Sequence, residues 1–170
     1  MSSSILQLNP ISRVRRNHGL EHATIHVLNK QFPHMKLGGV STPIGFIIIG
    51  EATTEDVAKA AIEALKRLRA GEIDLAFHPN CGTNYAIPGI FAGIAAWLGT
   101  LGSDKKMKSK LERLPLSILL ATFAFILTRN LGPLVQKRVT VAGDPEGMEL
   151  ERVETSVRMG IRMHRVITKG

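Results

Sequence analysis

Apolar residues are concentrated in two runs in the middle of the chain. Residues 75–103 contain no Asp, Glu, Lys or Arg, and a second apolar run covers residues 114–128. Because about 20 helical residues cross the hydrocarbon core of a bilayer, we expect residues 83–135 to form a transmembrane helical hairpin. The alternative is a pair of buried helices in a soluble protein, which the shortness of the second run favours.

On both sides of this segment the pattern predicts shorter elements. Helices are expected at residues 11–31 and 54–69, the second with Thr53 as N-cap and Asp56 at the capping-box position. Short apolar runs bounded by turn residues predict strands at 46–50, 73–77, 137–142, 148–155 and 161–168. Gly38, Gly39 and the TPIG segment at 42–45 are interpreted as loop. The expected fold class is α+β: residues 1–82 and 136–170 form one small mixed domain, and the hairpin 83–135 is inserted in it.

The charge balance indicates an anionic partner. The chain has 22 Lys and Arg against 14 Asp and Glu, a formal net charge of +8, and only 5% aromatic residues. Nucleic acid is not the expected partner, because its bases stack on aromatic platforms that this sequence lacks. The expected partner is a lipid bilayer, and the basic RVRR segment at 13–16 is expected to be solvated or to face lipid. A single cysteine excludes a disulfide framework and a four-cysteine zinc site.

The predicted localisation is the membrane, with several passes. The first ten residues show no secretory signal pattern, so we expect the polar part of the chain to be cytoplasmic. The basic connector between the apolar runs, at 102–113, argues for the opposite orientation by the positive-inside rule.

The segment RRNHGLEHATIHVL contains the first candidate chemistry. On a helix, His18 and His22 leave the same face, within reach of one metal ion, and Glu21 flanks that face. This is the H-x-x-E-H order, in which two imidazoles hold zinc and the carboxylate serves as a base. His26 extends the row by one turn. A polar helix face without a metal is the alternative interpretation.

The second candidate is HPNCGTN, at the start of the first apolar run. His78 and Cys81 are three residues apart and both are metal-ligand types. An ordinary turn with an inert cysteine is the alternative. If the two motifs meet, three protein ligands would leave the open position of a catalytic zinc, whereas four would close a structural site.

HGLEH and HPNCGT together resemble the paired motifs of the YqhQ-like bacterial membrane proteins, which are predicted metal-dependent enzymes. They also resemble a related bacterial domain-of-unknown-function family that shares both motifs. The resemblance covers about residues 13–83 and implies that His18, Glu21, His22, His78 and Cys81 are the functional positions. Asn80 stands where the YqhQ-like motif has arginine, and this chain has fewer apolar spans.

Three functions are therefore open. The first is a membrane-anchored zinc-dependent hydrolase, with His18, His22 and His78 or Cys81 as ligands and Glu21 as the base. Its substrate would be a membrane-proximal peptide or a lipid-derived group. The second is a non-catalytic membrane assembly or scaffold protein with a structural His/Cys metal site. The third is a thiol enzyme with Cys81 as nucleophile and His22 or His78 as base.

Overall fold

The computed structural model describes residues 5–102 and 107–170, which divide into two compact units. Unit 1 contains Met1–His78 and Lys137–Gly170, and unit 2 contains Pro79–Gln136. Four residues of the predicted basic connector, 103–106, lie outside the described residues.

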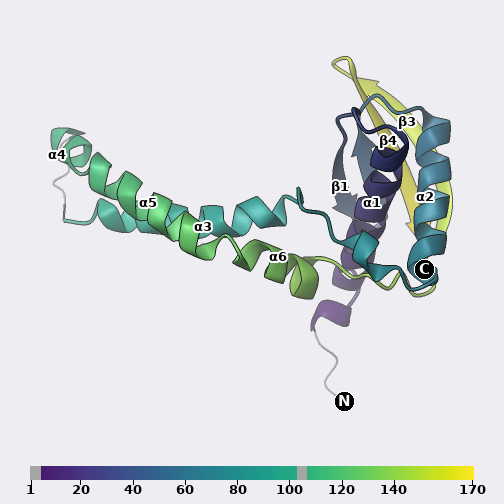
Figure 1. Cartoon of the computed structure of the whole chain (residues 1–170), viewed down its shortest axis with the longest axis horizontal. Coiled ribbons are helices and arrows are strands. Elements are labelled where there is room, and N and C mark those ends of the chain that lie inside the picture. The colour runs from purple at the N-terminus through teal and green to yellow at the C-terminus, as the bar shows by residue number, and fades with distance from the viewer. Residues whose placement is uncertain (1–4, 103–106) are drawn as a thin grey trace. The chain divides into compact units, whose positions relative to one another are not determined.

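Unit 1 is a four-stranded antiparallel sheet with two helices on one face (Figure 1). The strand order is β1-β2-β4-β3, so β4 pairs with both β2 and β3 although it is the last strand in the chain. The elements are a short 3₁₀ helix at Ile5–Gln7, α1 (Ile11–Gln31), β1 (Gly38–Thr42), β2 (Gly45–Ile49), α2 (Thr54–Arg69), a 3₁₀ helix at Ile73–Ala76, a π-helical turn at Gln136–Thr140, β3 (Glu149–Arg158) and β4 (Ile161–Lys169). The predicted α+β class is confirmed for this unit.

The core lies between the sheet and the two helices. Alternate residues of β2 and β4, such as Phe46 and Val166, point toward the helices and are almost fully buried. The facing side of α2 is built from alanines, which let α1 pack closely against it; the buried ones are Ala60, Ala61 and Ala64. The predicted cap of α2 is confirmed, since the Thr53 side chain accepts a hydrogen bond from the Asp56 N–H at 3.1 Å.

Two predicted strands are wrong. Residues 73–76 form a 3₁₀ helix, in which the N–H groups of Leu75 and Phe77 donate to the carbonyls of Glu72 and Asp74. Residues 136–140 continue the preceding helix as a π-helical turn, despite their β-branched side chains. Both segments pack against α1 instead of pairing with a strand, so tertiary contacts override local β-propensity.

One strand was not predicted. Gly38 and Gly39, interpreted as loop, begin β1, which pairs with β2 from Gly38↔Ile49 to Thr42↔Gly45. Glycine weakens a strand unless another group approaches the backbone closely. In β1 such an approach exists at Gly39, as the candidate site shows.

Unit 2 contains the two apolar runs as packed antiparallel helices. They are α3 (Thr83–Gly99) and α5 (Leu114–Thr128), with α4 (Met107–Glu112) and α6 (Leu131–Val135) as shorter helices. A Cβ on Gly99 would lie 2.8 Å from the Ser117 Cα, and one on Gly132 would lie 2.6 Å from the Asn84 Cα. The end of α3 therefore meets the start of α5, and the start of α3 meets α6. Helices α3 and α5 consequently run in opposite directions.

Among the described residues no single helix is long and apolar enough to span a bilayer, and only a bent pair, Leu114–Thr128 with Leu131–Thr140, passes that test by length and composition.

Candidate metal centre

Three histidines form a row along α1. His18, His22 and His26 are spaced by four residues, and the rings of His18 and His22 have centroids 4.4 Å apart. His22 is buried, while His18 and His26 are partly exposed. The helical pattern of residues 11–31 fixes this row, because positions four apart share one face.

Each histidine of the row is bonded to a main-chain carbonyl from another part of unit 1. Nδ1 of His18 lies 3.0 Å from the Thr140 carbonyl oxygen, and Nδ1 of His22 lies 2.7 Å from the carbonyl oxygen of Ala76. The ring of His26 uses the other nitrogen, with Nε2 3.0 Å from the Phe77 carbonyl oxygen. A carbonyl only accepts hydrogen bonds, so the histidine nitrogen is the donor in each case.

These bonds fix the tautomers. When Nδ1 of a neutral imidazole donates, Nε2 carries the lone pair that binds a metal. Histidine ligands of metals generally donate their other ring N–H to a carbonyl or carboxylate. Both His18 and His22 show this arrangement, whereas His26 has it reversed.

Gly19, the glycine of HGLEH, allows the main chain of Ala142 to come close to α1. A Cβ at Gly19 would lie 2.1 Å from the Ala142 carbonyl oxygen, so any larger residue would push the 140–142 segment away from α1. The Ala142 N–H also donates to the Arg15 carbonyl at 3.0 Å, near the N-terminal end of the same helix. The motif therefore has a ligand-type histidine, bonded to Thr140, next to a glycine that accommodates Ala142 of the same segment.

The ring of His78, two residues after the 3₁₀ helix Ile73–Ala76, lies beside this row. Its ring centroid lies 5.8 Å from that of His22 and 4.6 Å from that of His26. Two imidazoles on one zinc ion, with Zn–N near 2.0 Å, have centroids about 5 Å apart. Of the predicted ligands, His18, His22 and Cys81 form a group that could hold a metal ion.

Glu21 is turned toward the sheet. Its carboxylate is buried and accepts a hydrogen bond from the Ser41 hydroxyl of β1. A Cβ at Gly39 would lie 2.1 Å from Glu21 Oε1, so the strand has glycine where the carboxylate rests on it. This is the close approach that explains a glycine within β1. Neither contact has a direct signal in the sequence, where Gly38 and Gly39 are interpreted as loop.

The basic segment at 13–16 was predicted to be solvated or to face lipid, and this prediction is wrong. Arg16 is buried and forms an ion pair with Glu146, and Arg13 donates to the Thr168 carbonyl at 3.0 Å. Arg15 donates to the Val141 carbonyl at 3.2 Å. The three arginines instead tie α1 to the C-terminal part of unit 1, which explains why they cluster at the start of this helix.

The fold and the histidine row define a small α+β domain with a candidate metal centre on its first helix. The chain belongs to the family described as Domain of unknown function (DUF6391), whose model matches residues 13–153. It is also similar to an uncharacterized protein of the cyanobacterium Picosynechococcus sp., with 33% identity over 159 residues that cover 83% of this chain and 71% of the relative. No solved structure matches it significantly. The expected bacterial family of unknown function is thus confirmed, and the likeness to YqhQ-like proteins stays a prediction.

Proposed function

We propose that this protein is a metal-dependent hydrolase that binds zinc, or a similar divalent transition metal, through His18, His22 and Cys81. The observation that carries the proposal is the matched pair of Nδ1–H bonds from His18 and His22 to main-chain carbonyls. This pairing gives two adjacent imidazoles on one helix face the same ligand tautomer. A thiolate suits the same ion, since zinc accepts mixed histidine and cysteine ligands.

Three protein ligands are typical of a catalytic zinc site. When bound, such an ion supplies a Lewis acid and lowers the pKa of a water ligand to about 7. Glu21 precedes His22 directly and is the carboxylate in this motif. In the proposed reaction it takes a proton from the attacking water, whose oxygen bonds to the substrate carbonyl carbon. The bond between that carbon and the leaving nitrogen or oxygen then breaks, and Glu21 delivers the proton to the leaving group. Its bond to Ser41 holds the carboxylate in place.

A structural site is the second candidate, and the position of His78 favours it. The His78 ring lies 5.8 Å from His22, within the range expected for two ligands of one ion. With His78 as a fourth ligand the coordination shell would be closed, and Glu21 would serve only to anchor α1 on β1. The protein would then be a non-catalytic assembly or scaffold component.

We also propose that unit 2 anchors the protein in a bilayer, with unit 1 on the cytoplasmic side. Large apolar side chains are exposed all around α3 and α5; examples are Ile90, Trp97, Leu119 and Leu127, each at least 57% exposed. A helix that is apolar on every side suits lipid or a protein interior. Resistance of the full chain to carbonate extraction from membranes supports this anchoring, and its complete release contradicts it.

Elemental analysis of the purified full chain tests the metal. We expect about one zinc per chain in the wild type and a loss of metal in His18→Ala, His22→Ala and Cys81→Ala. His26→Ala is the matched control, because this histidine lies on the same helix row but donates through Nε2. A wild type that takes up no zinc, or a His22→Ala variant that retains it, contradicts the proposal.

Glu21→Gln separates the two candidates. For a hydrolase, we expect the variant to keep its zinc and to lose the turnover that the wild type shows on a panel of fluorogenic peptides and nitrophenyl esters. For a structural site, His78→Ala loses the metal and the wild type shows no metal-dependent turnover on this panel. Turnover that survives both chelation and Glu21→Gln contradicts the hydrolase.

A further inference from the structure

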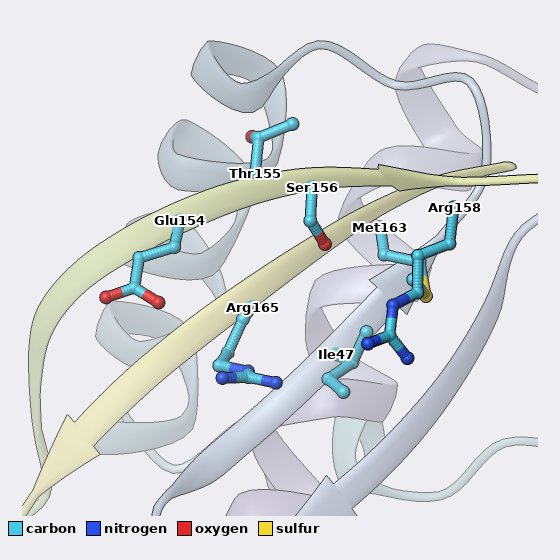
Figure 2. Close-up of a pocket in the computed structure, with 7 residues that line it drawn as sticks. All are labelled: Ile47, Glu154, Thr155, Ser156, Arg158, Met163 and Arg165. Atoms are coloured by element: carbon cyan, nitrogen blue, oxygen red, sulfur yellow. The ribbon is translucent and has the colours of Figure 1, made fainter. Parts of the chain in front are cut away.

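The sheet of unit 1 has a second face, which the two helices do not cover. Side chains alternate between the faces of a strand, and the register aligns Ile47, Arg165 and Glu154 across β2, β4 and β3. Ser156 and Met163 form the next row. These residues, with Thr155 and Arg158, line a hollow of about 350 Å³ (Figure 2).

Two arginines of this hollow have no partner in the fold. In residues 5–102 and 107–170 the guanidinium group of neither Arg158 nor Arg165 makes a hydrogen bond or an ion pair. Arg152, on the same strand as Arg158, is bound to both Glu151 and Glu154. Glu154, the acidic residue of the hollow, is therefore already neutralised, and the two free guanidinium groups leave a net positive site.

The guanidinium groups converge although they come from different strands. Figure 2 shows those of Arg158 and Arg165 on either side of Ile47, with the Ser156 hydroxyl on the same face. Guanidinium forks match the geometry of a phosphate and bind it with two parallel N–H···O bonds. The floor between them is apolar, formed by Ile47 and Met163.

We propose that this hollow binds a phosphate group that carries an apolar body, the chemistry of an anionic phospholipid headgroup. Arg158 and Arg165 hold the phosphate oxygens, Ser156 donates a further hydrogen bond, and the aliphatic part lies on Ile47 and Met163. None of the seven lining side chains is aromatic, which disfavours a nucleotide base as the attached body. The site is separate from the histidine row and does not depend on its function.

Calorimetric titration of the full chain in neutral detergent tests the site with three soluble probes. These are short-chain phosphatidic acid, the matching short-chain diacylglycerol without phosphate, and inorganic phosphate. We expect phosphatidic acid to bind most tightly, and both Arg158→Gln and Arg165→Gln to weaken it about tenfold, the loss expected for a charge-assisted bond. Lys59→Gln, a control on the exposed surface of α2 and outside the hollow, changes the affinity less than twofold.

Three results overturn the proposal. Equal binding of diacylglycerol shows that only the apolar part is recognised. An equal loss in Lys59→Gln shows that general surface charge is responsible. Inorganic phosphate that binds as tightly as phosphatidic acid, with the same dependence on Arg158 and Arg165, assigns the hollow to free phosphate and excludes the lipid. Thermal unfolding of each variant checks that these exposed substitutions leave the fold intact.

Discussion

Two buried histidines of unit 1 are built into the fold in different ways. His22 on α1 and His164 on β4 are 3% and 0% exposed, and each donates a ring N–H to a main-chain carbonyl, of Ala76 and Ala52 respectively. The second nitrogen of His164 accepts from the Thr155 hydroxyl at 3.1 Å, so the fold uses both sides of its ring. His22 instead has the rings of His18 and His78 beside it.

The comparison shows that burial alone does not identify a ligand histidine. The ring of His164 on β4 lies between Thr155 of β3 and Ala52 in the loop before α2, and it is hydrogen-bonded to both. The His22 region brings the imidazoles of His18 and His78 beside that of His22. A bound cation would use their lone pairs. We therefore treat His164 as structural and His22 as a ligand, and four changes test the distinction.

The largest expected effect is on metal-dependent stability. Zinc at 100 times its dissociation constant should stabilise the wild type by about 2.7 kcal/mol, and His22→Ala should remove this gain entirely. His164→Ala should keep it, since this residue is no proposed ligand. Thermal unfolding with and without zinc measures both. A zinc-induced gain that His164→Ala loses and His22→Ala keeps would reverse the assignment.

His164→Ala should have the larger cost in the absence of metal. It removes the donor to the buried Ala52 carbonyl and leaves space in the core, for a loss of about 2 kcal/mol in the free energy of unfolding. Urea denaturation of the zinc-free protein measures it. Thr155→Val, which removes only the hydroxyl bonded to the ring, is the milder control. A loss below a few tenths of a kcal/mol would contradict the structural role.

Gly39→Ala tests whether Glu21 belongs functionally to the His22 region. The new Cβ would meet the Glu21 carboxylate, which must move, and because that side chain is flexible we expect a cost of about 1 kcal/mol. Zinc content should be unchanged while any metal-dependent hydrolysis falls. Gly38→Ala is the control, since a Cβ there meets nothing within 4 Å. Unchanged hydrolysis in Gly39→Ala would argue against Glu21 as the base.

The smallest effect is a pH dependence from His164. Desolvation lowers the pKa of His164 below its ordinary value of 6.5, against an opposing contribution from the Ala52 bond, and Arg162 lowers it further. The unfolded chain then binds more protons than the folded one between these two pKa values. Stability should be full above pH 6.5 and fall as the pH drops toward the folded pKa, with a slope of at most about 1.4 kcal/mol per pH unit.

Urea denaturation between pH 5 and 8 measures this slope. The metal-free His22→Ala variant is the suitable background, because its stability does not depend on bound zinc. Adding His164→Gln should flatten the profile. A slope that survives this second substitution must come from other groups.

The sequence was sufficient for the elements with strong local signals. The 3.6-residue pattern and capping box placed α1 and α2, and the spacing of four placed His18 beside His22. The segments at 73–77 and 137–142 were predicted as strands because their local composition is β-like. They are helical because they supply carbonyls to the histidines of α1, a demand that appears only after the chain has folded.

The same reason limits the prediction of the site. Imidazole and thiol ligand types can be recognised from spacing, but Ala76, Thr140 and Phe77 act through main-chain carbonyls that every residue has. Ser41 and Gly39 lie in a strand without an apolar pattern, so their contacts with Glu21 have no local signature. Arg16 was misplaced because its partner Glu146 is 130 residues away in the sequence.

The position of β4 in the sheet has a consequence for biosynthesis. About 110 residues separate the end of β2 from the start of β4, and at 5–20 residues per second the ribosome needs roughly 6–22 s to make them. During this time β2 lacks one neighbour, and Arg13 of α1 lacks its partner on β4, the Thr168 carbonyl. The apolar helices of unit 2 are synthesised within the same interval. Premature pairing of the β2 edge with other chains is thus the characteristic risk of this topology.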